Sequence, residues 1–533
     1  MAWCSLCNYF NEIVLREIIL CIQPEIGFSY ELWRWIIDIE VTQKYPDADD
    51  FYQIKPSYRK LLQKHISNQR EIRSELVKIF DKGVCHEIYP QYWFLYEKEK
   101  LVNLILSNPS DIPGEVIDEM VSSFPYEESV IKGIVESLSG RLPEPKMYRI
   151  YQTAAAIPTK KNIDSILIFP TALFLEKVAS QLRPRKFRVF PLYIVSLVYQ
   201  TWSNYEKSIK TLERAISYLP EQNSKSAGVL LSRLALSYIM VENKSKVKVK
   251  NMSKAKEALL QADIILEINS NEWIDNQLNK QIWHMKRGYW QKALRIGLSL
   301  EGSIKDPYLK AKHAHIFGVN YLYEGNLEMA EKYARKCEEL SSLVTLSSWV
   351  IGKAWRNRFA YALLSTISLV NGYYKSLEEQ ETYFHNSLLI ARDTTRQLNP
   401  LFRLILGCTV ESHSLYTEAS IAAIKGDYLN AEHKYSQLEK DKHLEVYYRI
   451  SSSLDLAAIY LKTDRVEKAI AQYQYCVAKA FELGFKYLEI RALRKVCEIH
   501  FDERLVARRD ALNRDPYIIG SSYIDNLEFL IPV

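Results

Sequence analysis

The first part of the chain contains cysteine and histidine residues, which are common ligands of metal ions. Cys4 and Cys7 form a C-x-x-C pair, and Cys21 together with the adjacent Cys85 and His86 could complete a tetrahedral zinc site. The sequence has no second C-x-x-C to supply a four-ligand set. We therefore expect reduced thiols that pack as small apolar side chains, and we predict no metal and no cofactor.

Motifs that carry out catalysis are missing. The sequence contains no G-x-x-x-x-G-K-[ST], G-x-G-x-x-G, G-x-S-x-G or H-E-x-x-H, the signatures of common phosphate, dinucleotide, hydrolase and metalloprotease sites. His313 and His315 are two positions apart, so they would point to different faces of a helix. We predict that the protein is not an enzyme. One alternative stays open, a regulatory protein with an unrecognised enzymatic module in residues 1–140.

A basic cluster interleaved with aromatic residues is the candidate nucleic-acid contact. It lies in RPRKFRVF and comprises Arg183, Arg185, Lys186 and Arg188, with Phe187 and Phe190 between and beside them. Such a cluster can bind phosphates and stack bases. A second run of lysines, Lys244, Lys246, Lys248 and Lys250, lies in NKSKVKVKN. The net charge of +6 over 533 residues is too small to decide, so an RNA-associated protein is an alternative hypothesis.

The elements that would position any site form a recurring pair of helices. Small residues that would let a second helix approach the first recur every 37 to 54 residues, at Ser208, Ala255, Ala293, Ala330, a degenerate Leu377, Ala431 and Ala469. Nine positions earlier stand the rings of Tyr199, His284, Tyr321 and Tyr460, and seven positions later the small residues Ala215, Ala262, Cys337 and Cys476. This register predicts loops near Asn204, Gly288, Gly325, Gly426 and Asp464.

The pattern resembles the tetratricopeptide repeat family over about residues 190–500. The resemblance implies an all-α fold, an α-solenoid in which antiparallel helix pairs stack into a right-handed superhelix. Two features depart from the family. The tryptophan near the start of the first helix is missing, and the units around Leu377 and Ala431 are poor matches.

Four regions follow from the changes in pattern along the chain. Residues 1–140 read as helices without the repeat and without a persistent alternating strand, and we favour a degenerate continuation of the repeats over a separate module. Residues 141–189 are rich in proline and are predicted to form an elbow. The repeat array follows in 190–500, and residues 501–533 form a predicted C-terminal cap and tail.

Composition predicts a cytoplasmic protein. Hydrophobic residues make up 48% and charged residues 25% of the chain, as in ordinary globular proteins. The opening sequence has no signal-peptide pattern. The apolar stretch 166–174 is too short to span a bilayer and contains Pro170.

The predicted binding surface is the concave wall of the solenoid, which the first helix of each pair lines. Its inward positions in our register are Tyr193, Leu197, Leu278, Ile282, His315, Val319, Tyr416 and Leu454. These residues are mostly apolar or aromatic, and we found no Lys and Asn pair of the kind that holds a carboxylate in related repeat domains. The leading hypothesis is a scaffold or regulator that binds an apolar protein or peptide segment in this groove.

Overall fold

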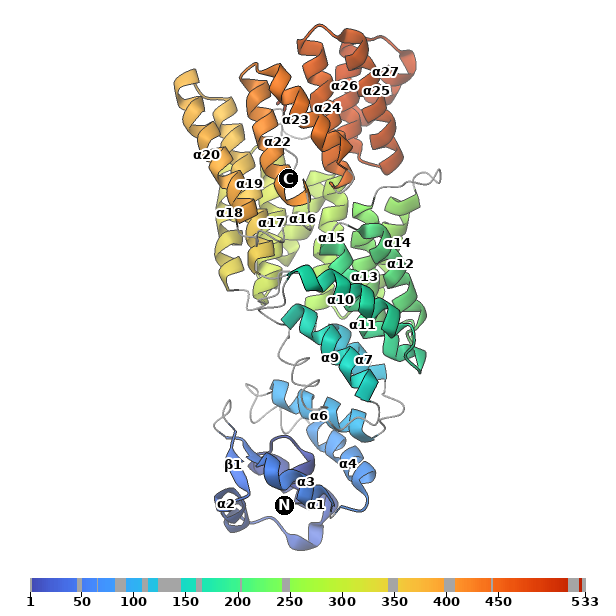
Figure 1. The fold of residues 1–533 in the computed structure, drawn as a ribbon, viewed down its shortest axis with the longest axis vertical. Coiled ribbons are helices and arrows are strands. Elements are labelled where there is room, and N and C mark those ends of the chain that lie inside the picture. The colour runs from blue at the N-terminus through green and yellow to red at the C-terminus, as the bar shows by residue number, and fades with distance from the viewer. Residues whose placement is uncertain are drawn as a thin grey trace. The chain divides into compact units, whose positions relative to one another are not determined.

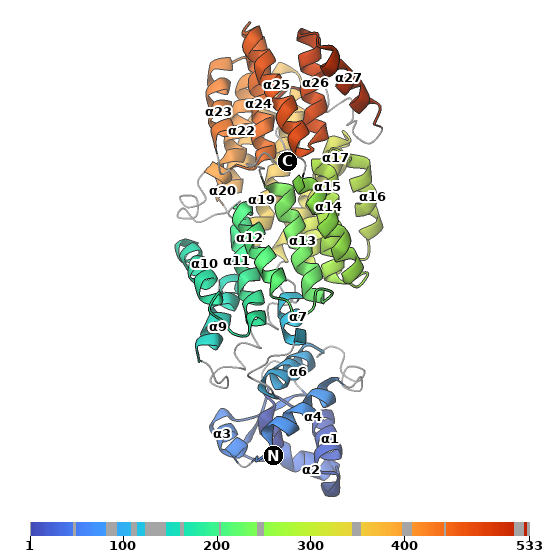
Figure 2. The ribbon, with the colours of Figure 1, turned by 90° about the vertical axis from the view of Figure 1, so that its right-hand side faces the viewer.

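The protein is described by a computed structural model that covers residues 2–45, 50–64, 66–81, 93–107, 114–122, 145–159, 165–201, 204–241, 250–343, 353–396, 408–441, 444–515 and 527–529. The chain forms two compact units. The first comprises residues 1–156, 177–191 and 218–220, and the second comprises 157–176, 192–217 and 221–533. Figures 1 and 2 show the path of the chain from two directions.

Short helices and one small hairpin make up the beginning of the chain. The elements up to residue 159 are η1 (Trp3–Leu6), α1 (Glu12–Ile22), η2 (Pro24–Ile26), α2 (Tyr30–Asp38), β1 (Thr42–Lys44), β2 (Tyr52–Ile54), α3 (Pro56–Lys64), α4 (Gln69–Asp81), α6 (Trp93–Ser107), α7 (Gly114–Ser122) and α9 (Pro145–Thr159). The apolar face of α1 is buried, including Val14 and Ile18. Asn11 caps this helix by accepting a hydrogen bond from the Val14 N–H.

The hairpin corrects our expectation that this region lacks strands. Strands β1 and β2 pair antiparallel, with Gln43 opposite Gln53, and Phe10 forms an isolated bridge with Tyr52. Each strand has three residues, which is too short for an alternating pattern to be recognised. The hairpin packs over an aromatic core, in which the ring of Phe51 lies edge-on to that of Tyr9. A hairpin is not part of a helix-pair repeat, so the residues that form it depart from the repeat pattern. Whether the rest of residues 1–140 continues the repeats stays a prediction.

The proline-rich segment contains helices. Besides α9, it holds α10 (Ser165–Ala179) and η4 (Arg185–Arg188). Pro145 begins α9, where a proline lacks only an N–H that would have no partner within the helix. Pro170 lies inside α10. The prolines therefore mark helix starts and turns here as well as an interruption of the repeat.

A succession of antiparallel helix pairs makes up the rest of the chain. The helices are α11 (Val189–Thr201), α12 (Tyr205–Ser217), α13 (Lys225–Met240), α14 (Lys250–Ile265), α15 (Asn271–Lys286), α16 (Trp290–Leu300), α17 (Pro307–Tyr323), α18 (Leu327–Ser342), α19 (Lys353–Tyr373), α20 (Leu377–Arg396), α22 (Cys408–Ile424), α23 (Tyr428–Lys440), α24 (Val446–Lys462), α25 (Val466–Leu483), α26 (Lys486–Ile499) and α27 (Glu503–Asn513). From α12 onward each helix packs on the next, and first helices of successive pairs also touch, as α13, α15 and α17 do. This is a tetratricopeptide-like α-solenoid.

The predicted repeat register is confirmed by burial and by the turns. The six small anchor residues, Ser208, Ala255, Ala293, Ala330, Ala431 and Ala469, are completely buried. The five predicted loops fall between the helices of a pair. At four of them Gly288, Gly325, Gly426 or Asp464 takes a positive φ, and at all five an N–H bonds back five residues, as from Asn326 to the Tyr321 carbonyl. This closure is the Schellman turn, which satisfies the last carbonyls of a helix.

The last repeats also pack against the middle of the array. The Lys486 ammonium donates a hydrogen bond to the Tyr289 hydroxyl at 2.5 Å, and Lys286 forms an ion pair with Glu445 at 2.9 Å. The ring of Tyr487 meets that of Tyr323 edge to face. Figure 2 shows α26 adjoining α15 and α17. These contacts join repeats that are more than 150 residues apart, which a strictly local stack of repeats would not do.

Replacing Ala330 by leucine is expected to lower the free energy of unfolding by about 1–3 kcal/mol, because three extra carbon atoms must enter a close-packed helix contact. Ala330 is completely buried. Ala471→Leu is the matched control, since Ala471 lies exposed on the second helix of another pair. Urea unfolding measures both variants, and equal midpoints would contradict the register.

Candidate partner-binding site

The predicted inner-wall residues are packed between helices. Of the eight, Ile282 and His315 are half-buried, and the side chains of Tyr193, Leu197, Leu278, Val319, Tyr416 and Leu454 are buried. The expected exposure is therefore wrong for these six. Their contact with a partner stays a prediction, and any partner would first have to move what covers them.

A buried ionic network fills the wall formed by α13, α15 and α17. The Asp275 carboxylate lies 3.1 Å from the Arg233 guanidinium and 2.7 Å from the Lys312 ammonium. Lys312 also donates to the Asn279 side-chain oxygen at 2.6 Å, and the Asn279 amide donates to the Ser232 hydroxyl at 2.9 Å. Our register did not anticipate that charged residues from three helices would fill this wall.

Burial sets the protonation of the groups around this network. Loss of hydration lowers the pKa of the Lys312 ammonium, although the nearby Asp275 opposes that shift. Burial likewise raises the pKa of the Tyr193 hydroxyl to about 12. Asp275 is the carboxylate that pairs with both cations of this network, Arg233 and Lys312. This region is a structural core and offers no open surface for a ligand.

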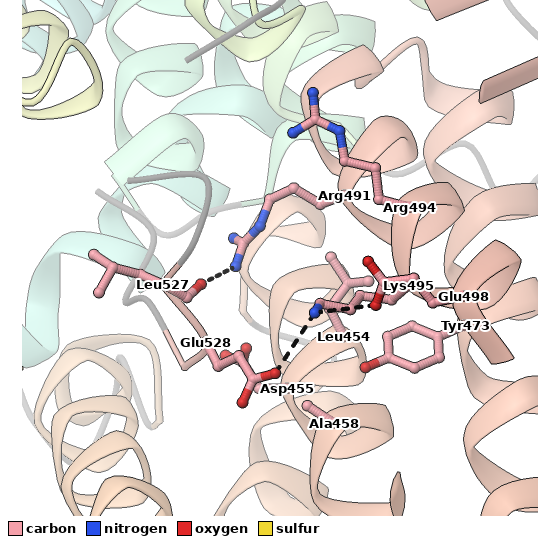
Figure 3. A pocket seen from close by; sticks show the side chains of 10 residues that line it. All are labelled: Leu454, Asp455, Ala458, Tyr473, Arg491, Arg494, Lys495, Glu498, Leu527 and Glu528. Carbon is pink, nitrogen blue, oxygen red and sulfur yellow. Dashed lines mark hydrogen bonds and ion pairs between the residues drawn. The ribbon is translucent and has the colours of Figure 1, made fainter. Parts of the chain in front are cut away.

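A second stretch of the wall holds a segment of the chain itself. We call Leu527–Phe529 the LEF segment, after its sequence. The Arg491 guanidinium of α26 donates to the Leu527 carbonyl at 3.0 Å. The Phe529 N–H donates to the Asp455 carboxylate of α24, and the Glu528 backbone bonds to the Tyr373 hydroxyl at the end of α19. Side chains of three repeats thus pair with the main chain of this segment. Figure 3 shows the bond from Arg491 to Leu527.

The side chains of the LEF segment are recognised as well. The Phe529 ring is 4% exposed and joins a core that includes Tyr416 and Ala419 of α22. It stacks on the Tyr435 ring with 6.4 Å between centroids. The Glu528 carboxylate lies 3.3 Å from Lys462 and 3.7 Å from Lys495. The wall therefore provides an apolar socket for one side chain and a pair of cations for its acidic neighbour.

Asp455 is the buried acid at the centre of this site. The Tyr416 hydroxyl donates a hydrogen bond to it. Burial raises the pKa of the Asp455 carboxyl to about 7, against the opposing charge of Arg491 and the bonds from Tyr416 and Phe529. Its charge therefore changes near neutral pH.

Replacing Asp455 by asparagine is expected to flatten the pH dependence of stability. Because the folded protein holds the Asp455 proton up to a pKa of about 7, against 3.8 for an unperturbed group, this carboxyl stabilises the fold fully below pH 3.8. That contribution falls as the pH rises through about 7. The loss in unfolding free energy between pH 5 and pH 8, measured by urea melts, should thus be smaller in Asp455→Asn. Asp464→Asn, at an exposed turn, is the control, and identical slopes in the two variants would refute the assignment.

A pocket of about 160 Å³ lies beside the LEF segment. Its lining residues are Leu454, Asp455, Ala458, Tyr473, Arg491, Arg494, Lys495, Glu498, Leu527 and Glu528 (Figure 3). Lys495 spans its side, paired with both Glu528 and Glu498. The pocket is charged, with guanidinium, ammonium and carboxylate groups around its wall. It could admit a polar side chain next to the segment.

Sequence reasoning found part of this site and missed its charged residues. Tyr416 and Leu454 were predicted inner-wall positions, and both lie at the LEF site. The charged groups Asp455, Arg491, Lys462 and Lys495 were missed. Asp455 is next to a predicted position and Arg491 and Lys495 are four residues apart on one helix, which was an available signal. We had found no Lys and Asn pair that would hold a carboxylate, and here a pair of lysines, Lys462 and Lys495, lies beside the Glu528 carboxylate.

The basic cluster differs from a stacking surface. Arg183 and Arg185 are exposed and Lys186 is half-buried, but Arg188 is buried and donates to the Leu182 carbonyl at 2.9 Å. Its guanidinium lies 5.1 Å from the centre of the Tyr218 ring. Phe187 and Phe190 are buried, so these rings are not on the surface where the RNA alternative would need them to stack on bases. Lys244, Lys246 and Lys248 of the second lysine run lie outside the described residues.

The thiols of the candidate zinc motif lie inside the core of the first unit. Cys4 and Cys7 are buried and unbonded, and burial raises the pKa of each thiol. Cys21 is exposed, and Cys85 and His86 lie outside the described residues. Within the described ranges, no three metal-ligating side chains gather at one place. No helix among those residues is long and apolar enough to cross a membrane.

Three solved structures match this chain at low sequence identity. A Rap protein complexed with competence and sporulation factor matches with a TM-score of 0.50 and 12% identity, over 69% of this chain and 97% of that one. A signal transduction ATPase with numerous domains and a tetratricopeptide repeat sensor, from Pyrococcus horikoshii, matches with a TM-score of 0.35 and 15% identity. The match covers 94% of this chain and 65% of that one. Scc4 in complex with Scc2n matches with a TM-score of 0.38 and 11% identity, over 86% of this chain and 85% of that one.

At these identities the likeness concerns the fold alone. The Rap structure supports the tetratricopeptide-like solenoid, in agreement with the repeat register found in the sequence. No protein-family profile matches the chain, and a comparison with curated proteins gives no match.

Proposed function

We propose that this protein is a non-enzymatic interaction protein that binds an extended segment of a partner protein on the inner wall formed by α19, α22, α24 and α26. The observation that carries the proposal is the LEF segment, a short non-helical piece of polypeptide already seated on this wall. Arg491 and Asp455 bond to its main chain, and Phe529 fills an apolar socket. A surface that holds one peptide in this way has the chemistry to hold another.

The mode of recognition follows from the fold. A helical wall has no free strand edge, because its backbone groups bond within each helix. Main-chain recognition of a peptide must therefore come from side chains, and Arg491, Asp455 and Tyr373 provide it here. The apolar socket adds affinity, and the two lysines add a preference for acid.

The comparison supports a binding role for such an array. The Rap protein was solved as a complex with competence and sporulation factor. We propose by analogy that the present array acts as a regulator, in which capture of a partner segment changes the packing of the last repeats on the middle of the array. A cytoplasmic location is part of the same proposal.

Selection from a random peptide library tests the proposal. The full chain serves as bait beside its Arg491→Ala variant, with Arg335→Ala as the matched control, because Arg335 pairs with Glu331 on the exposed face of α18. We expect enriched peptides that bind the parent and the control and lose affinity for Arg491→Ala. Peptides that bind all three proteins equally would place binding elsewhere and contradict the proposal.

A further inference from the structure

We propose that the LEF segment is a resident ligand that occupies the site in place of the partner, and that the partner segment carries the same chemistry, an acidic residue between two large apolar residues. This inference rests on the proposed function. It adds the class of partner sequence and states that the partner must displace the chain's own segment.

The number of specific contacts on three residues is the first argument. The Leu527 carbonyl, the Glu528 backbone and the Phe529 N–H each have a side-chain partner from the array. A buried main chain needs partners for its polar groups, and here side chains of the array supply them. Separate groups of the wall contact the main chain, the Glu528 carboxylate and the Phe529 ring. A peptide site achieves specificity through such separate contacts.

The backbone of Phe529 is the second argument. Its φ is +60°, in the left-handed region that bulky residues seldom adopt. Such a conformation persists only where surrounding contacts hold it, and it occurs preferentially at ligand clamps and switches. A partner peptide that could reach the socket without this strain would have an advantage over the resident segment.

Access to the acidic subsite is the third argument. The side chains of Lys462 and Lys495 remain 46% and 40% exposed while they hold Glu528. An exposed ion pair of this kind is weak and exchanges readily. A carboxylate from a partner can therefore reach the lysines first, and the adjoining pocket leaves room for it. Phe529, which is deeply buried, would leave last.

Tethering determines how large the effect should be. A segment attached to its own site acts at an effective concentration of about 1 mM. A free peptide with a dissociation constant near 10–100 µM must compete with it, so its apparent affinity should be roughly 10- to 100-fold weaker than for an emptied site.

A labelled peptide of residues 524–533, IDNLEFLIPV, capped at both ends, is the probe. Fluorescence anisotropy compares the full-length parent with two full-length variants, Phe529→Asp, which removes the anchor, and Glu528→Lys, which repels the lysines. We expect weak binding to the parent and about 10- to 100-fold tighter binding to each variant. Glu331→Lys is the matched control, because it reverses an exposed charge away from the site, and it should bind like the parent.

A charge exchange tests the acidic subsite directly. In the Phe529→Asp background, Lys462→Glu with Lys495→Glu should weaken the probe about tenfold. A probe with lysine in place of its glutamate should recover that loss only in the doubly reversed protein. A purely structural role for the two lysines would give no such recovery.

Three results would overturn the inference. Equal binding by parent and emptied variants would show that the segment does not compete. Absence of binding to a variant that melts like the parent would show that it is a structural cap. A parent that dimerises with concentration, while Phe529→Asp stays monomeric, would make a second copy of the chain the occupant. If library peptides depend on Arg491 but never compete with the probe, only this inference fails and the proposed function stands.

Discussion

Replacing Asp275 by alanine is expected to lower the free energy of unfolding of the repeat array by about 3–5 kcal/mol, because it leaves two buried cations without their shared counter-ion. Arg233 and Lys312 are both within 3.1 Å of this carboxylate, and all three side chains are almost completely buried. Water cannot replace the lost charge there. Urea unfolding followed by circular dichroism gives the change.

The matched control for Asp275→Ala is Glu331→Ala. Glu331 pairs with Arg335 on an exposed helix face, where an ion pair contributes about 0.2–1 kcal/mol. The Asp275→Ala defect should also shrink as the pH rises, because burial lowers the pKa of Lys312 and the folded state then holds fewer protons than the unfolded state. A similar loss in both variants, independent of pH, would show that Asp275 does not balance the cations.

Gly288→Ala is expected to lower the free energy of unfolding by about 2–4 kcal/mol, because strain and overpacking coincide at this turn. Gly288 has a φ of +78°, which an alanine adopts at a cost. A Cβ placed there would also lie 2.7 Å from the Tyr487 Cβ and 3.1 Å from its backbone nitrogen. The backbone of Tyr487 cannot move aside as the end of a flexible side chain can. The turn after α15 and the start of α26 must therefore move apart.

Gly426→Ala separates the two causes. Gly426 has nearly the same φ, +83°, but no atom lies within 4 Å of its would-be Cβ. Its replacement should show the strain alone, about 1–2 kcal/mol. Hydrogen exchange in α26 should rise in Gly288→Ala and stay unchanged in Gly426→Ala. Equal losses in the two variants would mean that the turn does not pack on Tyr487.

The repeat architecture could be predicted because its signals are local. Ala330 and Ala469 are small where two helices must come close, and Gly325 and Gly426 stand where a Schellman turn needs a positive φ. Each of these requirements lies within about 30 residues of sequence, and it recurs. The hairpin of β1 and β2 escaped prediction because strands of three residues are too short to show a period.

The site could be predicted only in part because its residues are distant in sequence. Tyr416 and Leu454 followed from the repeat register, but their neighbours Arg491 and Phe529 come from another repeat and from the end of the described chain. The sequence pattern of α26 does not predict that Arg491 will donate a hydrogen bond to the Leu527 carbonyl. The same holds for Asp275, whose two cations lie on α13 and α17.

The helix pairs, their turns and the all-α solenoid follow from local sequence, because spacing and residue size along the chain set how one helix packs on the next. What the inner wall holds follows instead from contacts between distant parts of the chain. Burial there depends on which repeats meet, as Gly288 meets Tyr487, and on a segment that returns to Asp455 and Arg491 from outside the repeats. One part of the inner wall is therefore filled by the ionic network of Arg233, Asp275 and Lys312, and another part is covered by the LEF segment.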